Sequence, residues 1–181
     1  MRLFIGIDLP NHVKLSLFKS QLRLKKLGVK GSWKAPEDFH ITMEFLGDFP
    51  PEFVPALIQI LNTVVTDKRI FRLHIGNIGA FPSFQRAQVL WAGVGGAVEK
   101  LDEIWSELHG ELGTAGFSLQ KAPFRPHITL LTRPKALVPG LDAFRLRVTG
   151  KFIVTELVLF ESKVEDRKRV YPHLYCAVLH R

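Results

Sequence analysis

Apolar residues recur along this chain with two different spacings, and the two spacings predict different elements. Short apolar or alternating runs favour strands, and they cover residues 2–8, 29–36, 39–47, 71–81, 88–94, 126–132, 144–162 and 170–180. Helical spacing, opened by proline or closed by glycine, covers residues 9–28, 50–67 and 96–116. Strands and helices mixed in this order predict an α+β fold.

The second half of the chain repeats the rhythm of the first. Each half has a strand, a helix and a further strand that starts with His-Ile-Thr and an apolar residue, at residues 40–43 and 127–130. No sequence identity beyond this motif links the halves, so the repeat lies in the order of the elements. We expect residues 1–181 to form a single domain built as a duplicated α+β unit.

Composition restricts the class of protein. With 46% hydrophobic and 23% charged residues over 181 positions, the chain can bury a sizeable core and is not expected to be disordered. Residues 1–10 lack the apolar segment and cleavage site of a signal peptide, and the apolar runs are too short to span a membrane. We therefore expect a cytoplasmic protein without membrane contact. The single cysteine, Cys176, excludes an intramolecular disulfide and follows an alternating pattern typical of a small core side chain.

The charge of the chain points toward anionic partners. Its net charge is +8 and its pI is near 9.8. An excess of Lys and Arg attracts polyanions, so RNA, DNA and phosphorylated metabolites become the favoured partners. A basic surface without any such partner would give the same net charge.

The two His-Ile-Thr strands carry the strongest chemical signal. With 7 histidines and 8 threonines in 181 residues, chance predicts about 0.3 His-x-Thr triplets, and two occur. Residues i and i+2 of a strand share a face. His40 therefore lies beside Thr42, and His127 beside Thr129, with apolar residues on the opposite face. A single triplet would favour a hydrogen-bonded core histidine, whereas a matched pair in a basic protein favours a shared site.

Two histidines suit a displacement reaction at phosphorus. One group must take a proton from the attacking oxygen and another must protonate the leaving oxygen, and an imidazole with an unperturbed pKa of about 6.5 can do either. A threonine hydroxyl on the same face can donate to a phosphate oxygen. The other histidines have no HExxH or Cys/His spacing, so the sequence predicts neither a metal site nor a cofactor.

Several segments resemble one protein family in the same order along the chain, namely residues 33–48, 78–83, 89–94, 116–130 and 157–163. They resemble the bacterial and archaeal RNA 2′,3′-cyclic phosphodiesterases, formerly called 2′-5′ RNA ligases, of the two-histidine phosphoesterase superfamily. The resemblance covers essentially the whole chain, and the paired motifs are specific in combination. It implies two pseudo-symmetric lobes, each an antiparallel sheet with outer helices, which face each other across a central cleft with one motif on each wall.

The resemblance also implies an activity. The family opens a 2′,3′-cyclic phosphate at an RNA end to a 2′-phosphomonoester without a metal ion, and a reversible 2′-5′ ligation uses the same geometry. By motif position, His40 would be the proton donor to the departing 3′-oxygen and His127 the proton acceptor that activates water. Thr42 and Thr129 would hold phosphate oxygens. RNA ends or nucleotides with a cyclic phosphate, tRNA fragments among them, would be the substrates of a monomeric enzyme.

Two arginines are candidates because the chain departs from the family pattern. The family commonly has an Arg five residues after the second motif's histidine, where this chain has Thr132. Arg133 follows and would share the face of His127 in an unbroken strand, but a bulge would change that. Many relatives also have an Arg just before the segment at 89–93. Arg86 stands nearby and is either its substitute in substrate binding or a solvated surface residue.

Other aromatic and basic residues have two interpretations each. Trp33 would stack on a base or anchor the core, and Arg125 would attract phosphate at the cleft rim or face solvent. Phe45 alternates away from His40 on a regular strand, so we expect it in the core. The basic run at residues 167–169 replaces a Gly-containing turn of the family and is either a solvated loop or a contributor to RNA capture.

Two functions of different classes remain open from the sequence alone. The first is the metal-independent phosphodiesterase, and the second is an RNA-binding module that uses a basic cleft without turnover. Both predict salt-sensitive RNA binding, because both depend on neutralising phosphates. Only the first function requires both histidines.

Overall fold

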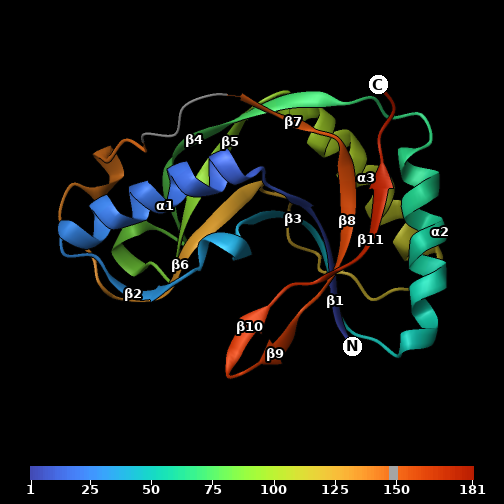
Figure 1. Ribbon diagram of the computed structural model, residues 1–181, viewed down its shortest axis with the longest axis horizontal. Helices are drawn as coiled ribbons and strands as arrows, with labels where there is room; N and C mark the ends of the chain where they lie inside the picture. Colours follow the sequence, from blue (N-terminus) through green and yellow to red (C-terminus); the bar gives the residue numbers. More distant parts are fainter. Residues whose placement is uncertain (147–150) are drawn as a thin grey trace.

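The computed structural model describes residues 1–146 and 151–181, and its strands and helices follow the predicted order (Figure 1). The strands are β1 (Arg2–Asp8), β2 (Lys30–Trp33), β3 (His40–Asp48), β4 (Phe71–Phe81), β5 (Val89–Gly96), β6 (His127–Ala136), β7 (Lys151–Val154), β8 (Glu156–Glu161), β9 (Lys163–Glu165), β10 (Lys168–Val170) and β11 (His173–Val178). The helices are α1 (Asn11–Lys26), α2 (Val54–Val65) and α3 (Val98–Thr114). This is the α+β class that the hydrophobic pattern predicts.

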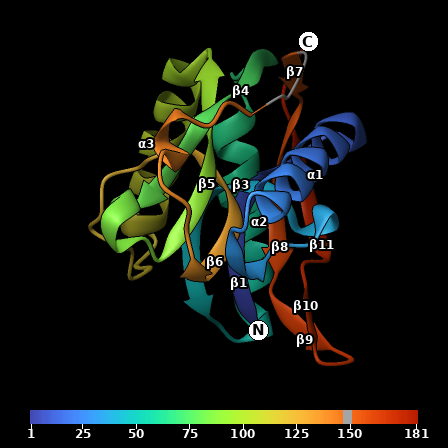
Figure 2. The same ribbon diagram turned by 90° about the vertical axis from the view of Figure 1, so that its left-hand side faces the viewer.

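Two antiparallel sheets make up the two lobes (Figure 2). One sheet has the strand order β11-β8-β1-β3 and the other the order β2-β6-β5-β4-β7, while β9 and β10 form a separate hairpin. The motif strands β3 and β6 belong to different sheets, as the two-lobed arrangement requires. The sheets do not follow the two halves of the sequence, because β1 and β3 from the start of the chain share a sheet with β8 and β11 from its end.

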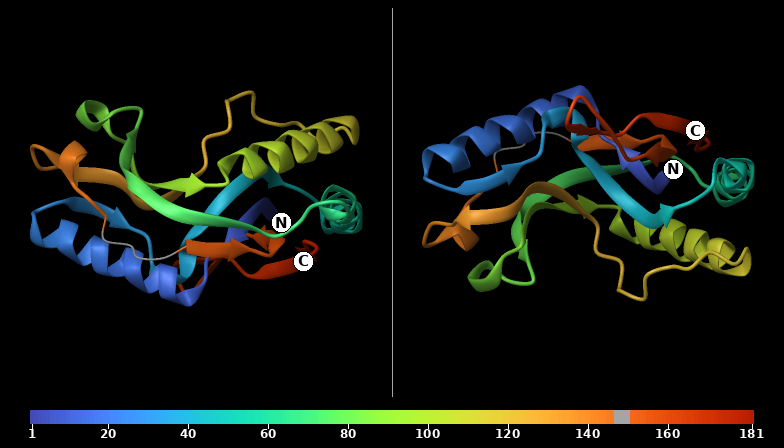
Figure 3. Two further views of the ribbon diagram at one scale, coloured as in Figure 1. Left: turned by 90° about the horizontal axis from the view of Figure 1, so that it is seen from above. Right: turned by 90° about the horizontal axis from the view of Figure 1, so that it is seen from below.

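The helices bury their apolar sides against the sheets and against each other. Helix α2 packs on β8, β11 and α3, and both views of Figure 3 show it almost end-on at one side of the molecule. Helices α1 and α3 end where a glycine takes a left-handed conformation, at Gly28 (φ 100°) and Gly116 (φ 86°), as the sequence predicts. Among the helices of the described residues, none is both long and apolar enough to cross a membrane.

One hydrophobic core joins the two lobes. Residues from both sheets and from all three helices are buried in it, among them Ile41 of β3 and Ile128 of β6, which are each 0% exposed. These two are the apolar neighbours predicted for the motif histidines. A slip of either strand by one residue would turn its histidine into this core, so the core fixes the register of both motif strands.

The predicted elements differ from the structure mainly in the C-terminal part of the chain. The strand expected over residues 144–162 is divided into β7 and β8, and residues 147–150 of that prediction lie outside the described part of the chain. Residues 163–170, which include the run interpreted as a loop, form the hairpin β9–β10. The last strand begins at His173 rather than at residue 170.

Candidate active site

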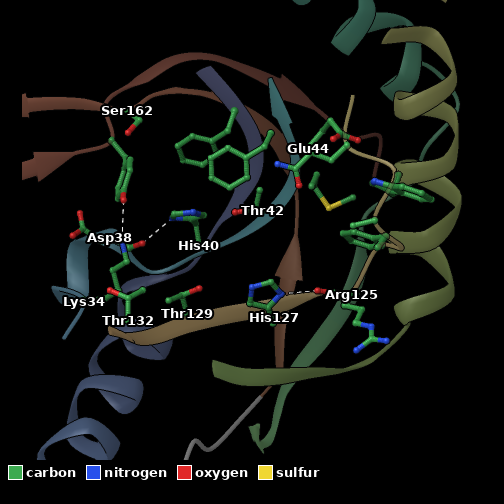
Figure 4. Close-up of a pocket in the computed structure, with 18 of the residues that line it drawn as sticks. Lys34, Asp38, His40, Thr42, Glu44, Arg125, His127, Thr129, Thr132 and Ser162 are labelled. Carbon is green, nitrogen blue, oxygen red and sulfur yellow. Dashed lines mark hydrogen bonds between the residues drawn. The ribbon is translucent and has the colours of Figure 1, made fainter. Parts of the chain in front are cut away.

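A cleft of about 430 Å³ brings the two motifs together (Figure 4). In this view His40 and Thr42 on β3 face His127 and Thr129 on β6 across the open space. The charged side chains of its lining are Arg2, Lys34, Asp38, Glu44, Arg125 and Arg169. Cations outnumber carboxylates, so the cleft suits an anion held between two imidazoles. Across residues 1–146 and 151–181, no three His, Cys, Asp or Glu side chains gather to hold a metal ion.

The alternation predicted for the motifs is present on both walls, and on each wall a glycine of the neighbouring strand lies opposite one motif residue. Thr42 lies opposite Gly6 of β1, and His127 lies opposite Gly93 of β5. A methyl group at Gly6 would lie 2.6 Å from the carbonyl oxygen of Ile41, which is too close for any side chain. Glycine at this position therefore allows β1 to pair closely with the motif strand.

Each motif histidine is oriented by a hydrogen bond within its own wall. Nδ1 of His40 donates to the backbone carbonyl oxygen of Asp38 at 2.7 Å, and Nδ1 of His127 donates to that of Arg125 at 2.6 Å. A carbonyl oxygen can only accept, so Nδ1 carries the hydrogen in both rings. Among the described residues Nε2 has no hydrogen-bond partner in either ring, so it can accept a proton or, once protonated, give one.

Aromatic neighbours lower the basicity of the two rings. The ring of His40 lies 4.7 Å from that of Phe4 and 5.3 Å from that of Tyr171, measured between centroids. This burial lowers the pKa of His40 from 6.5 to about 4. Burial also lowers the pKa of His127, which packs edge-on against Phe81 at 4.9 Å. Both imidazoles are therefore mainly neutral at pH 7 before an anion binds.

A bulge interrupts β6 directly after its motif. The pairing with β5 shifts register beyond Thr129, and the next two residues, Leu130 and Leu131, are both buried, in different core clusters. The alternation is reversed past this point. Thr132 therefore lines the cleft, whereas Arg133 is exposed, has a left-handed backbone (φ 50°) and is absent from the lining. The expectation that Arg133 reaches the phosphate required an unbroken strand, and the geometry does not meet it.

The corresponding irregularity in β3 corrects the interpretation of Phe45. The pairing with β1 shifts register between Thr42 and Glu44, so Phe45 turns toward the cleft, where its side chain is 42% exposed. A regular strand would have put Phe45 in the core, and the bulge is the reason that this prediction is wrong. Phe45 and Thr132 hold the same place on the two walls, five residues after their histidines.

The other site residues predicted from the sequence lie in different places, and only one of them lines the cleft. Arg125 is exposed at the rim of the cleft beside His127 (Figure 4). Arg86 is exposed in the 3₁₀ turn Phe84–Arg86 and does not line the cleft. Trp33 also lies outside the lining and packs against the second core cluster, with Nζ of Lys25 5.2 Å from its ring centroid. Of its two interpretations, the core anchor fits this placement and base stacking does not.

Lys34 and Tyr171 line the cleft but belong to neither sequence motif. Nζ of Lys34 donates to the hydroxyl of Tyr171 at 3.0 Å, and Figure 4 shows Lys34 beside Thr132. The charge of Lys34 also contributes to the lowered pKa of His40. Strand alternation offered a signal for Lys34, since it follows the core residue Trp33 and must face the other way. No such signal existed for Tyr171, because it depends on the unpredicted hairpin β9–β10.

A hydrogen-bonded pair, Glu44 and His109, lies at the end of the cleft next to α3. Glu44 is 5% exposed, and its Oε2 accepts a hydrogen bond from Nδ1 of His109 on α3 at 2.8 Å. Trp105 packs against His109 at 4.9 Å and against Phe124 at 5.4 Å between ring centroids. This end of the cleft is mainly aromatic and has one carboxylate, Glu44, and one cation, Arg125. Cations outnumber Asp38 at the end with Lys34, so that end suits an anion better.

Comparisons with known proteins agree on one family. Residues 7–91 match the family model described as LigT like phosphoesterase. The chain is 36% identical to the RNA 2′,3′-cyclic phosphodiesterase of Aeropyrum pernix over 77% of this chain and 81% of that protein. It is 32% identical to the RNA 2′,3′-cyclic phosphodiesterase of Thermus thermophilus over 94% and 86%. The crystal structure of Escherichia coli LigT complexed with 3′-AMP matches with a TM-score of 0.82 and 25% identity, over 99% of this chain and 98% of that one. The chain therefore belongs to the RNA 2′,3′-cyclic phosphodiesterase family of LigT-like phosphoesterases.

Proposed function

We propose that this protein hydrolyses the 2′,3′-cyclic phosphate at an RNA end to a 2′-phosphomonoester by metal-independent acid–base catalysis. The observation that carries the proposal is the pair of imidazoles on opposite walls. In each, Nδ1 donates to a backbone carbonyl and Nε2 has no partner in the part of the chain that the structure describes. The names of the relatives support a cyclic phosphate on RNA as the substrate. The 3′-AMP bound to the E. coli relative supports a site for a nucleotide.

The two histidines divide the proton transfers. Nε2 of His127 takes a proton from water while the water oxygen forms its bond to phosphorus. His40, protonated at Nε2, gives its proton to the 3′-oxygen as the bond between phosphorus and that oxygen breaks. The products are a 2′-phosphate and a 3′-hydroxyl, and exchange of one proton with solvent at each ring restores the starting state. An RNA 5′-hydroxyl in place of water would give a 2′-5′ linkage by the same transfers, so ligation is the companion reaction.

Hydroxyls and one ammonium group stabilise the phosphate in this scheme. Thr42 and Thr129 each lie two residues from a histidine on the same face, and their hydroxyls donate to the non-bridging oxygens. Lys34, held by Tyr171, supplies the positive charge on the wall of His127 and Thr132. The bound anion also raises the pKa of both imidazoles, and this favours the protonated His40 that the reaction needs.

The product of the reaction tests this proposal directly. Purified protein incubated in EDTA with an RNA oligonucleotide that ends in a 2′,3′-cyclic phosphate is expected to yield a 2′-phosphate end, which ³¹P NMR distinguishes from a 3′-phosphate. A 3′-phosphate would show that the 2′-oxygen leaves, contrary to the proposed geometry. Salt-sensitive binding without any turnover would instead favour the RNA-binding module.

Lys34 offers a test of the anion site. Replacing Lys34 by methionine keeps the length of the side chain but removes a charged donor, so kcat/KM for the cyclic phosphate should fall by about 10-fold to 100-fold, the range for one hydrogen bond to a charged group. Lys30→Met is the matched control, because Lys30 is exposed at the start of β2, the strand that ends directly before Lys34, and lies outside the cleft. Equal losses of kcat/KM in the two variants would show that Lys34 does not contact the phosphate.

A further inference from the structure

The hairpin β9–β10 extends away from the body of the protein (Figures 1 and 2). Lys168 pairs with Glu165, which leaves Asp166 and Arg167 as a two-residue turn. Both turn residues have positive φ, 46° and 63°, as the tight turn that matches a twisted hairpin requires. Asn-Gly and Asp-Gly are the usual sequences for such a turn, so an arginine at its second position is uncommon. This position places a long cationic side chain at the tip of a projecting element.

Positive charge predominates on the hairpin. Residues 163–169 contain two lysines, two arginines and two carboxylates. A salt bridge of 2.7 Å joins Lys163 to Glu165 and neutralises one charge of each sign. Arg167 and Lys168 are exposed, and within the described residues neither forms a salt bridge. The tip therefore presents two cations and one carboxylate, that of Asp166, to solvent and keeps a net positive charge.

One face of the hairpin continues the wall of the cleft. Arg169 lies opposite Val164, and residues that pair across two strands share a face. Tyr171 comes two residues after Arg169, and both side chains line the cleft. Arg169 is held there by donating from Nη1 to Oγ of Ser162 at 2.7 Å. The surface thus runs from Tyr171, whose ring packs against His40, through Arg169 to the tip.

From this continuity we propose that the hairpin binds the RNA strand that leads to the cyclic end, and that the protein selects oligonucleotides over mononucleotides. The inference rests on the proposed function, which places the terminal phosphate between the histidines. A 3′-terminal nucleotide in the cleft requires the preceding nucleotides to leave it on the 5′ side. Arg169 contacts the phosphate nearest the cleft, and Arg167 at the tip contacts a phosphate farther along the strand. Lys168 pairs with Glu165 and lies on the face opposite to Arg169, where it adds positive charge near the tip.

The opposite end of the cleft is a poorer exit for RNA. The carboxylate of Glu44 lies there with aromatic side chains and one cation, Arg125. At the hairpin end three cations outnumber the single carboxylate of Asp38, and they are Arg2, Lys34 and Arg169. The hairpin end therefore has the larger excess of positive charge, which attracts a phosphodiester. Val164, 62% exposed on the same hairpin face as Arg169, adds an apolar surface that a base can cover. Both ends together give the RNA strand one favoured direction.

The double variant Arg167→Gly/Lys168→Thr tests the hairpin without disrupting it. Glycine creates an Asp-Gly turn, which favours this conformation, and threonine suits a strand. The kcat/KM for a six-nucleotide RNA with a cyclic end should fall about tenfold, while that for the corresponding cyclic mononucleotide stays within twofold. A plot of log(kcat/KM) for the hexamer against log salt concentration should lose about 0.7 from its slope, the value for the one phosphate contact of Arg167.

A control variant and a binding assay decide between the outcomes. Lys19→Ala/Lys26→Ala removes two exposed charges from α1, and it should leave both substrates unaffected. Equal losses on hexamer and mononucleotide, or an equal loss in the α1 variant, would overturn the hairpin assignment. Fluorescence anisotropy with a hexamer that already carries a 2′-phosphate measures binding without turnover. If this hexamer bound through the hairpin but no cyclic phosphate were opened, the proposed reaction would fail and the hairpin assignment would stand.

Discussion

Alanine in place of His40 or His127 is expected to lower the turnover of a cyclic-phosphate-ended RNA by about 10²-fold or more, the usual contribution of a positioned acid or base. Each imidazole performs one proton transfer that no other group of its wall can supply with the same geometry. Binding of RNA with a 2′-phosphate end should change only a few-fold, because the cations of the cleft remain. Rapid single-turnover measurements and anisotropy separate the two quantities.

The double variant sharpens this expectation. Two groups that act in one step give losses that do not add, so His40→Ala/His127→Ala should be little slower than the worse single variant. His12→Ala serves as the control, since His12 is exposed on α1 and lies outside the cleft. Folded single variants that kept near-wild-type turnover would refute the catalytic assignment of the two histidines.

The second large effect is the dependence of the rate on pH. The reaction needs one proton on the pair, so kcat/KM should rise and then fall with pH. Unperturbed histidines would centre this profile near neutrality. Burial lowers the pKa of His40 to about 4 and that of His127 below 6.5, so the singly protonated free enzyme predominates at acid pH. We therefore expect the maximum of kcat/KM below pH 6.5 and a decline of about tenfold per pH unit on its alkaline side.

The profile of kcat should lie at higher pH than that of kcat/KM, because kcat reports the complex in which a bound phosphate raises both pKa values. In Lys34→Met the acid limb of kcat/KM should also move to higher pH, since the charge of Lys34 lowers the pKa of His40. Both profiles are measured in EDTA. A rate that needed a divalent metal and rose steadily into the alkaline range would indicate metal-bound hydroxide and contradict the acid–base pair.

Hydrophobic periodicity was sufficient to predict most of the fold, and the resemblance supplied its two-lobed arrangement. Strands and helices with strong patterns, such as β1 and α3, lie within a few residues of their predicted limits. Strict alternation also placed both histidines and both threonines on one face. It failed at the residues just beyond the motifs, because an extra residue in β3 and in β6 reverses the alternation there. Phe45 and Arg133 were misplaced for this single reason.

The other unpredicted parts of the site depend on contacts between distant segments. Tyr171 lines the cleft only because β9 and β10 fold into a hairpin, and its strands of three residues are too short for a periodic signal. Glu44 lies on a predicted strand, but its partner His109 is 65 residues away on α3. A local pattern in the sequence cannot indicate such a pair. The position of Lys34 could have been predicted from local alternation, since its neighbour Trp33 packs against the core and the next residue must face the other way.

The interleaving of the sheets has a consequence for how the protein folds. The chain passes from one sheet to the other between β1 and β2, β2 and β3, β3 and β4, and β7 and β8. Neither half of the sequence contains all the strands of either sheet. The inner strand β1 pairs with β8 from the far end of the chain, so this pairing forms only after β8 has been synthesised and brought to β1. Such distant pairings slow folding, because the entropy cost of closing a long loop comes before the favourable contacts that the paired strands form. We therefore propose that residues 1–181 unfold in one cooperative step, and that a cut at the middle of the chain would leave two fragments that are each unfolded on their own.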